Sequence, residues 1–314
     1  MSEGLWRSRG GDHPSKAFVL IVSDHPLTAK IVAELKQARS KLERAISPGS
    51  EMFPAIRALR RTEQRLERPL RLAVCGEVNA GKSSLANLLG RIETLPTAAI
   101  SNTRIPTLLY YAHEPEIWAV HHTPGWRVRV RADRKTLPQS VFRLEVGLPS
   151  RGLRVAQILD LPGLADPGHV DLAFHAVDAV LWCTVSTQAW KESERRAWNQ
   201  FPARLRSRGL LVSTHADLLA SARDAEKLLT RLRSECGSLF QNVIMVATVN
   251  ALALMREDEP APVEAAWKDT GADALDAALS ALLLSVRNRR ARSALRVTGR
   301  IADRAMSYIE SGGS

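Results

Sequence analysis

The pattern of hydrophobic and polar positions divides this chain into a helical beginning, a middle of alternating strands and helices, and a helical end. Before residue 70, apolar side chains recur three and four positions apart in two stretches, which is the spacing of amphipathic helices. Ser47-Pro48-Gly49-Ser50 lies between the two stretches and predicts a break. The predicted apolar faces are Ile31, Leu35, Ala38, Leu42 and Ala45 or Ile46 for the first helix, and Met52, Ile56, Leu59 and Leu66 for the second.

From about residue 70, short apolar runs alternate with helical segments. Such alternation predicts an α/β fold with a doubly wound sheet and a ligand at the carboxyl ends of the strands. The segment 112–150 adds strands and a turn at Thr123-Pro124-Gly125, and we expect an antiparallel edge there. The expected strands are 70–75, 107–111, 116–121, 126–131, 142–147, 153–159, 178–184, 209–214 and 242–248, and the expected helices are 82–90, 188–200, 219–235 and 272–286.

The end of the chain predicts a loop and then a helix with two unlike faces. The region 249–270 is acidic and contains Pro, which is typical of a loop. The densest basic cluster follows at Arg287, Arg289, Arg290 and Arg292. In the closing helix we expect an apolar face of Ala291, Leu295, Thr298, Ala302, Ala305 and Ile309, and a basic face of Arg292, Arg296, Arg300 and Arg304.

Composition narrows the class of partner without choosing one. The 314 residues include 44 basic and 33 acidic ones, a formal net charge of +11. That excess favours an acidic partner such as anionic lipid, nucleic acid or an acidic protein, although many soluble proteins carry as much charge without one. The sequence lacks the interleaved aromatic and basic residues of single-strand nucleic-acid binders, so we expect nucleic acid not to be the partner.

Cysteine usage and hydropathy predict a cytoplasmic protein that is at most peripheral at the inner membrane. The three cysteines, Cys75, Cys183 and Cys236, are scattered, which argues against a disulfide framework and against zinc. The sequence contains no apolar run near the roughly 20 residues that span a bilayer. The short run 17–22 lacks the cleavage pattern of a signal peptide and predicts a strand.

The most specific motif is Gly76-Glu77-Val78-Asn79-Ala80-Gly81-Lys82-Ser83-Ser84, which matches G-x-x-x-x-G-K-[ST] between a buried strand and a helix start. Gly76 and Gly81 let the backbone curl so that successive N–H groups point at one phosphate. Lys82 can bridge the β- and γ-phosphates, and the Ser83 hydroxyl can ligate Mg²⁺. This stretch therefore predicts a nucleotide-phosphate site.

Two further stretches complete the expected phosphate and metal site. Asp160 ends an apolar strand and is followed by Leu161-Pro162-Gly163. Its carboxylate can hold Mg²⁺ through water, and the N–H of Gly163 can bond the γ-phosphate. Thr103, in the loop between the P-loop helix and the next strand, can complete the Mg²⁺ shell.

Two stretches after later strands fit a base-reading site. In Thr214-His215-Ala216-Asp217, an Asp can accept two hydrogen bonds from guanine that adenine cannot donate. Asn250 lies in Ala247-Thr248-Val249-Asn250-Ala251 after the last predicted strand, where backbone N–H groups can reach the guanine O6. Both stretches predict guanine rather than adenine.

Taken together, residues 70–250 resemble a P-loop GTPase of the dynamin superfamily, especially its bacterial members. The segments that carry the resemblance are the P-loop, Thr103-Arg104-Ile105-Pro106, Asp160-Leu161-Pro162-Gly163 and Thr214-His215-Ala216-Asp217. His215 is a departure, because the family has Lys there, although an imidazole ring can also stack on the base. The resemblance implies GTP and GDP as ligands, hydrolysis to GDP and phosphate with Lys82, Ser83, Thr103 and Asn79 at the reacting phosphate, and Mg²⁺ held by Ser83, Thr103 and Asp160.

The resemblance also bears on how hydrolysis is activated. The residue after Pro162-Gly163 is Leu164 rather than Gln, so no side chain there can orient the attacking water. Asn79 occupies the P-loop position that holds K⁺ or Na⁺ in related cation-dependent GTPases. In this family the cation site is completed when two G domains pair, so the resemblance implies a homodimer or a dimer with a related GTPase.

The flanking helices resemble the neck of dynamin-like proteins, in a minimal form that lacks a long stalk. The expected domains are an N-terminal segment over 1–25 that is partly mobile, neck parts over 26–68 and 271–311, and a GTPase domain over 69–270. The Arg-rich C-terminal helix is the candidate surface for an anionic membrane or protein. Two alternatives stay open: a nucleotide-controlled binding switch with little hydrolysis, and a ribosome- or RNA-associated GTPase.

Overall fold

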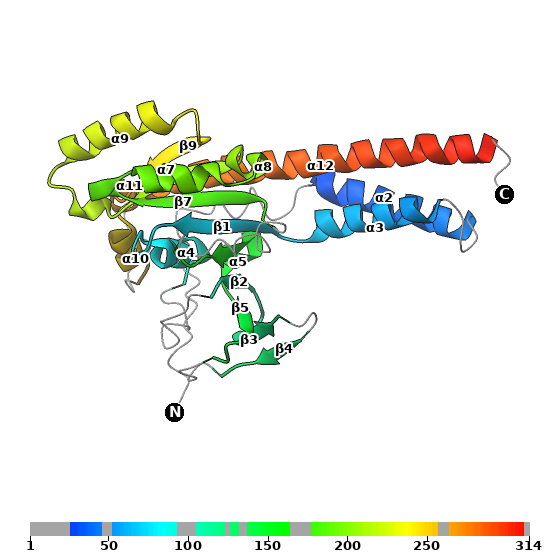
Figure 1. Cartoon of the computed structure of the whole chain (residues 1–314), viewed down its shortest axis with the longest axis horizontal. Helices are drawn as coiled ribbons and strands as arrows, with labels where there is room; N and C mark the ends of the chain where they lie inside the picture. Colours follow the sequence, from blue (N-terminus) through cyan, green and yellow to red (C-terminus); the bar gives the residue numbers. More distant parts are fainter. Residues whose placement is uncertain are drawn as a thin grey trace. The chain divides into compact units, whose positions relative to one another are not determined.

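The chain forms two compact units in a computed structural model (Figure 1). Residues 1–20 and 70–282 form one unit, named here the sheet unit, and residues 21–69 and 283–314 form the other, named the helical unit. The expected strand over 17–22 and the expected turns at 47–50 and 123–125 lie outside the described residues. The structure describes residues 26–45, 52–92, 105–122, 126–131, 137–163, 177–256 and 264–310.

The described strands of the sheet unit form one mixed sheet with the order β4-β3-β5-β2-β6-β1-β7-β8-β9. Neighbours from β6 through β9 pair in parallel, whereas β2 runs antiparallel to β6. The strands are β1 (Leu70–Gly76), β2 (Thr107–Tyr111), β3 (Glu116–His121), β4 (Arg127–Arg129), β5 (Val141–Leu148), β6 (Ala156–Asp160), β7 (Ala179–Val185), β8 (Gly209–Thr214) and β9 (Asn242–Met245).

The predicted α/β sheet with flanking helices is confirmed, and so is the antiparallel edge expected over 112–150. There β3 pairs antiparallel with both β4 and β5. The helices of the sheet unit are α4 (Lys82–Gly90), α5 (Arg151–Val155), η3 (Ser186–Gln188), α7 (Glu192–Asn199), α8 (Ala203–Arg206), η4 (Ala216–Leu218), α9 (Ala222–Cys236), α10 (Thr248–Arg256), α11 (Glu264–Asp269) and the first turns of α12 (Ala272–Glu310).

Aromatic side chains fill much of the sheet unit's core. Trp198 stacks on Phe240 with ring centroids 4.3 Å apart and meets Trp182 edge-on at 5.6 Å. Gly209 opens β8 beneath this group, because a Cβ there would lie 2.7 Å from Cζ2 of Trp198. The close fit between strand and ring fixes α7 against the sheet, since interiors are packed too densely to absorb an extra methyl group.

Several predicted boundaries of the sheet unit are wrong, and the helix expected over 219–235 begins only at Ala222. The strand expected over 153–159 begins only at Ala156, because residues 151–155 form the helical turn α5. The helix expected from 188 begins at Glu192, after the η3 turn. The strand expected to reach 248 ends at Met245, and the loop expected over 249–270 contains α10 and α11. Burial of Ala251, Leu252 and Trp267 anchors these two helices, and the acidic and Pro residues between them hid that signal.

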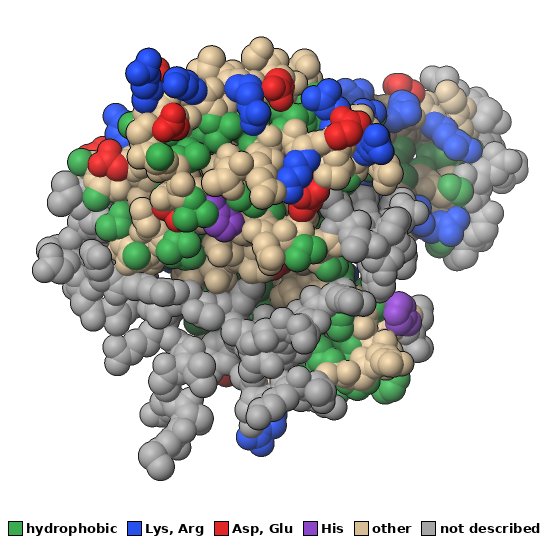
Figure 2. Space-filling model, turned by 60° about the vertical axis from the view of Figure 1, so that its left-hand side comes forward, with side chains coloured by type: hydrophobic (Ala, Val, Ile, Leu, Met, Phe, Trp, Pro, Cys, Tyr) green, Lys and Arg blue, Asp and Glu red, His purple; other side chains and the backbone are tan. Residues whose placement is uncertain are grey.

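The surface mixes charge with small apolar groups. Figure 2 shows one face of the molecule, on which Lys and Arg side chains lie between acidic and uncharged ones. The sheet unit exposes several large apolar side chains near its expected ligand edge, among them Val78, Leu218 and Val249. Within the described parts of the chain, no helix combines the length and the hydropathy needed to cross a bilayer.

The helical unit packs α2 (Pro26–Ala45) and α3 (Phe53–Glu67) with the part of α12 that follows residue 282. Both predicted N-terminal helices are confirmed. Their apolar stripes do face a shared core, where small alanines of α12 let the helices approach closely. The buried core residues are Ile31, Leu35, Leu59, Leu66, Ala291 and Ala294.

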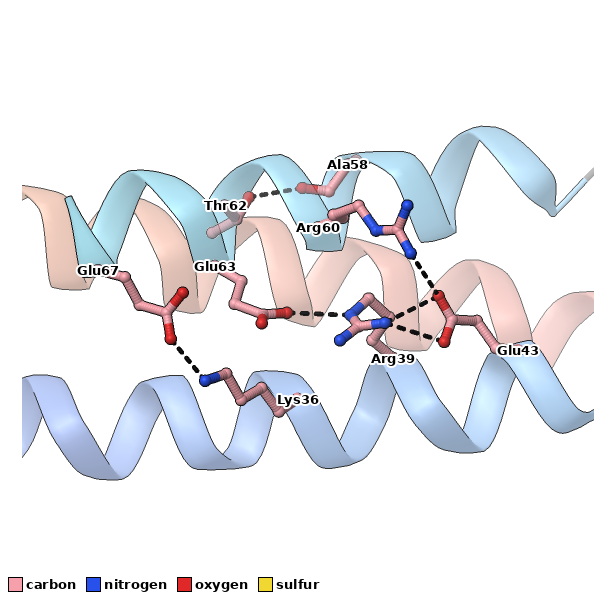
Figure 3. Close-up of polar contacts among 8 residues, drawn as sticks. All are labelled: Lys36, Arg39, Glu43, Ala58, Arg60, Thr62, Glu63 and Glu67. Carbon is pink, nitrogen blue, oxygen red and sulfur yellow. Dashed lines mark hydrogen bonds and ion pairs between the residues drawn. The ribbon is translucent and has the colours of Figure 1, made fainter.

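The polar seam between α2 and α3 is closed by ion pairs (Figure 3). The guanidinium of Arg39 donates to Glu43 on its own helix and to Glu63 on α3, each at 2.9 Å. Lys36 pairs with Glu67 at 2.5 Å, and Arg60 lies 3.8 Å from Glu43. Carboxylates of both helices are therefore neutralised inside this seam.

The predicted faces of α12 need correction. Ala291, expected on the buried face, is buried, but Leu295, also expected there, is 51% exposed, and Ala294 takes its place on the buried side. Each residue advances about 100° around a helix, so a pattern read through 291, 295, 298 and 302 is turned away from the true contact line. Arg290, expected in the basic surface cluster, is buried and donates to the backbone oxygens of Arg65 and Arg68 at 3.0 Å.

Candidate nucleotide-binding site

Parallel pairing brings the predicted motifs to one edge of the sheet. Residue 76 ends β1 opposite Cys183 of β7, and Asp160 ends β6 opposite Val74 of β1. Thr214 ends β8 opposite Val185. The P-loop, Asp160 and the 214–217 stretch therefore leave the sheet from its carboxyl edge, where ligands bind in open α/β folds.

The P-loop backbone explains its two fixed glycines. Gly76 has a φ of 145°, and a Cβ there would collide with the carbonyl oxygen of Cys183. Gly81 has a φ of 73° and caps the start of α4. Asn79 adopts a left-handed φ of 61° without being a glycine. These turns direct the chain into α4, whose first N–H groups have no acceptor within the helix and can meet an anion.

Lys82 and Ser83 occupy the positions predicted for them. Lys82 is 9% exposed, and its Nζ donates to the carbonyl oxygen of Glu77 at 2.6 Å, across the mouth of the loop. The hydroxyl of Ser83 donates to Oδ2 of Asp160 at 2.8 Å, which joins two motifs 77 residues apart.

The environment of Asp160 fits a divalent cation. Its Oδ1 is buried and has no hydrogen-bond partner among the described residues. Burial raises the pKa of this carboxyl to about 6, although the Ser83 hydroxyl and the charge of Lys82 oppose the rise. Mg²⁺ binds oxygen ligands, and this site offers a hydroxyl oxygen and a carboxylate oxygen that has no described hydrogen-bond partner.

Gly163 lies against the P-loop, as its predicted role requires. A Cβ on Gly163 would lie 2.6 Å from Cγ2 of Val78 and 3.1 Å from its backbone nitrogen. The backbone after Asp160 is thus held beside the phosphate loop, where its N–H can point to the same ligand. Thr103 and Leu164 lie outside the described residues.

Thr214 ties the base-reading stretch to the P-loop. Its buried Oγ1 lies 3.0 Å from the carbonyl oxygen of Ala80, 3.2 Å from that of Thr184 and 2.9 Å from Nδ1 of His215. A hydroxyl has one proton to donate. If a carbonyl receives it, the contact with His215 requires a proton on Nδ1.

The ring of His215 lies over the P-loop. A Cβ on Gly81 would come within 3.1 Å of Cε1 of His215. His215 itself has a left-handed φ of 58°, which turns the chain sharply after β8 into η4. An imidazole therefore stands beside Gly81 at the position where the matching motif carries Lys.

Asp217 and Asn250 lie on neighbouring elements. η4, which carries Asp217, packs beside α10, and the N–H of Ala216 donates to the carbonyl of Val246 at 3.4 Å. Both side chains are exposed. The stretch expected as a loop at 247–251 is the start of α10, so Asn250 sits in a first helical turn, whose N–H groups lack acceptors within the helix.

A clamp on Glu77 was not predicted from the sequence. Its carboxylate accepts hydrogen bonds from the hydroxyl of Ser193 at 2.5 Å and from Nζ of Lys191 at 3.1 Å. The Ser193 hydrogen bond and the Lys191 ammonium lower the pKa of Glu77, against a smaller opposing effect of burial. The first half of the P-loop is thus attached to the turn that begins α7.

Glu194 holds that turn from inside. It is 2% exposed and accepts from the N–H of Lys191 at 2.9 Å, Nε1 of Trp182 at 3.1 Å and Oγ1 of Thr184 at 2.9 Å. Burial raises its pKa despite these three donors. The spacing of residues 191 and 194 is that of a helix cap and could have predicted the start of α7. It could not have predicted the contacts of this turn with Glu77.

Comparison with known proteins agrees with these motifs. The model of the dynamin family matches residues 72–141. The isoniazid-induced protein IniC of Mycobacterium tuberculosis is 36% identical over 114 residues, which cover 33% of this chain and 23% of that protein. Dynamin-like protein 2 of Campylobacter jejuni is 24% identical over 197 residues, 59% of this chain and 32% of that protein.

A solved structure extends the likeness in fold. A member of an oligomerised bacterial dynamin pair superposes with a TM-score of 0.60 over 90% of this chain and 56% of its own, at 17% identity. The chain thus spans about a quarter to a third of the curated relatives and about half of this structure. The motifs, the family model over residues 72–141 and the fold agree with one another, and this chain is similar to P-loop GTPases of the dynamin superfamily.

Proposed function

We propose that this protein binds GTP with Mg²⁺ and hydrolyses it to GDP and phosphate. The observation that carries the proposal is the hydrogen bond between Ser83 and Asp160 beside the P-loop, next to a buried oxygen of Asp160 that has no described partner. A hydroxyl and a carboxylate so placed are what a nucleotide-bound magnesium ion needs. When bound, that ion neutralises charge on the phosphates.

The chain's own residues have distinct roles in this proposal. Lys82 exchanges its present acceptor, the Glu77 carbonyl, for the β- and γ-phosphates, and the amides of residues 77–84 and 163 surround the transferring phosphoryl group. Ser83, Thr103 and Asp160 hold the metal. Asp217 accepts from guanine, the N–H groups around Asn250 reach its O6, and the ring of His215, backed by Thr214, stacks beside Gly81.

Hydrolysis by this route needs a further positive charge beside that of Lys82, because Leu164 offers no side chain that could orient the attacking water. We propose that Asn79 helps to hold K⁺ or Na⁺ and that pairing of two G domains, in a homodimer or with a related GTPase, completes the site. The described bacterial dynamin neighbour is an oligomerised pair, which supports pairing as a hypothesis. Such supplied charge raises turnover by about 10³- to 10⁵-fold in other GTPases.

The test measures turnover per molecule against protein concentration in potassium, sodium and a bulky organic cation. Specific activity should rise with concentration and should be highest with a small cation. Asn79→Ala should remove the cation response while GDP affinity stays within a few-fold of wild type. Activity that is flat with concentration and indifferent to the cation contradicts the pairing mechanism and favours a nucleotide-controlled binding switch, which His215 and Leu164 also allow.

We also propose a place of action, peripheral on the cytoplasmic side of a membrane. The neighbouring dynamin pair is described as sensing and tethering membranes, and this chain carries a net charge of +11. A basic protein is attracted to the anionic surface of such a membrane.

A further inference from the structure

The charge of the chain is concentrated in one unit. Residues 21–69 and 283–314 contain 17 Lys and Arg against 8 Asp and Glu, an excess of nine out of the chain's eleven. The much larger sheet unit contains 27 against 25, an excess of two. A partner chosen by charge should therefore meet the helical unit.

Within the helical unit, three of the eight acidic residues form ion pairs in the seam between α2 and α3. Glu43, Glu63 and Glu67 all pair with basic side chains of those two helices, as Figure 3 shows. Few acids then remain to balance α12. Residues 283–314 contain seven Arg against two acids, an excess of five, and residues 21–69 contain ten Lys and Arg against six acids, an excess of four.

The basic face of α12 is exposed and uncompensated. Arg292, Arg296, Arg300 and Arg304 are all exposed, and none forms an ion pair with a side chain that the structure describes. They repeat every four residues over a rise of about 18 Å. The row thus presents four positive charges along this part of the helix, and the exposed carboxylate of Asp303 lies on the same side without an ion pair to them among the described contacts.

Two apolar side chains border this row. Leu295 is 51% exposed and Met306 is 61% exposed. They are separated by about three helical turns and therefore share one side of α12. Gly299, between them, has open space where a Cβ would lie. This strip lies between the buried alanine side and the arginine row.

We infer that this face of α12 binds the surface of an anionic lipid bilayer, with the arginines at the lipid phosphates and Leu295 and Met306 below them. The inference rests on the proposed membrane location and adds the surface that makes the contact. A helix with cationic side chains next to a narrow apolar strip suits the interface of a bilayer. The apolar strip beside the arginines favours a bilayer over an acidic protein, because the interface of a bilayer takes up both kinds of side chain along one helix.

The experiment is co-sedimentation of the full chain with vesicles of phosphatidylcholine alone or mixed with phosphatidylglycerol. The test variant replaces Arg292, Arg296, Arg300 and Arg304 with Gln. The matched control removes the same charge from α2 and α3 by replacing Lys41, Arg44, Arg57 and Arg61, all exposed, with Gln. A third variant, Leu295→Ser with Met306→Ser, removes the apolar strip and keeps the charge.

Each arginine at an anionic surface contributes about fivefold, from about 1 kcal/mol. The α12 variant should therefore lose two to three orders of magnitude in partitioning at low salt, by the same estimate, and the control much less. The serine variant should lose about three- to tenfold, since less apolar area is buried, with an unchanged salt dependence. Circular dichroism and GDP binding verify that each variant is folded.

Several results would overturn the inference. If the wild-type protein does not sediment with the mixed vesicles, the inference is wrong. If the α12 and control variants lose binding equally, net charge alone determines vesicle binding and the α12 face is not the binding surface. Polyglutamate binding as tight as vesicle binding, with no effect of the serine changes, points to an acidic protein instead. GTP turnover is measured in solution on the same preparations, so loss of the proposed enzymatic function is distinguished from loss of the membrane surface.

Discussion

The two units of this molecule use polar side chains in opposite ways. In the sheet unit, the key hydrogen bonds join residues far apart in sequence: Ser83 to Asp160, Ser193 to Glu77 and Thr214 to Ala80, over 77, 116 and 134 positions. In the helical unit, the ion pairs of Arg39 reach partners only 4 and 24 positions away. The first unit converges these polar groups on one edge. The second pairs Arg39 with acids close in sequence and exposes four arginines on α12, and buried Arg290 is the exception, because it donates to backbone oxygens more than 220 positions away.

This difference matches the two proposals, in which the sheet unit hydrolyses the nucleotide and the helical unit binds the membrane surface. The sheet unit has almost no net charge, so its site selects a ligand by geometry rather than by attraction from a distance. The helical unit has an excess of nine positive charges and a small core of aliphatic side chains, so its surface attracts anionic groups. Changes in one unit should therefore leave the function of the other intact.

The largest expected effect is on turnover in the sheet unit. Lys82→Ala removes the charge that the proposal places at the β- and γ-phosphates, and the rate of GTP hydrolysis should fall by about 10²- to 10³-fold or more. Binding to anionic vesicles should not change. Phosphate release measured on purified protein provides the rate, and Lys41→Ala in α2 is the control that removes one lysine elsewhere. Undiminished hydrolysis in Lys82→Ala would falsify the assignment of the P-loop.

The next effect concerns the base. Asp217→Asn reverses the polarity of one hydrogen bond, so GTP affinity should fall by about 100-fold and xanthine nucleotides should be preferred. Titration calorimetry with both nucleotides measures the switch, and Asp269→Asn on α11 is the control. If ATP and GTP bind wild type equally well, the guanine assignment is wrong.

The sequence predicted the elements of the sheet unit well because their signals are local. The strands at 107–111, 116–121 and 209–214 and the helix at 82–90 begin and end where the structure places them. Gly76 and Gly81 were predictable because the motif itself specifies the backbone turns. Ser83 and Asp160 were each predicted to hold Mg²⁺, and the hydrogen bond between them is a finding of the structure.

The sequence could not predict features that depend on contacts between distant segments, or on which side of a helix packs against its neighbours. The clamp of Lys191 and Ser193 on Glu77 crosses more than a hundred residues and leaves no periodic trace. The buried side of α12 is chosen by α2 and α3, so the pattern of α12 alone placed Leu295 inward by mistake. Helix α10 was missed because the acidic and Pro residues beyond it outweighed a short apolar run.

Removing an ion pair between α2 and α3 tests whether the effect stays within the helical unit. Arg39→Ala leaves Glu63, whose side chain is 11% exposed, without its ion pair. The free energy of unfolding of this unit should fall by about 2–3 kcal/mol, because a partly buried charge loses its partner. Urea unfolding followed by circular dichroism measures it. Arg60→Ala is the control: that side chain is 63% exposed and 3.8 Å from Glu43, and its loss should change stability by less than about 1 kcal/mol. A loss of GDP affinity in Arg39→Ala would break the separation of the units.

The smallest expected effect tests whether the clamp on Glu77 matters to the sheet unit. The pKa of Glu77 is lowered in the folded state, so its contribution to stability is present above the ordinary pKa of a Glu side chain and is lost as pH falls through the folded pKa. Glu77→Gln removes this contribution, which solvent screening limits to about 1 kcal/mol because the Glu77 and Lys191 side chains are 30% and 43% exposed. The difference in unfolding free energy between wild type and Glu77→Gln should therefore shrink on acidification below that ordinary pKa, while the titration of Asp160 cancels between the two. The hydrogen bond from Ser193 is the largest cause of the shift, so Ser193→Ala should reproduce more of the effect than Lys191→Met. If Lys191→Met has the greater effect, long-range charge rather than a fitted hydrogen bond holds the P-loop, and the contrast between the two units is weaker than their geometry indicates.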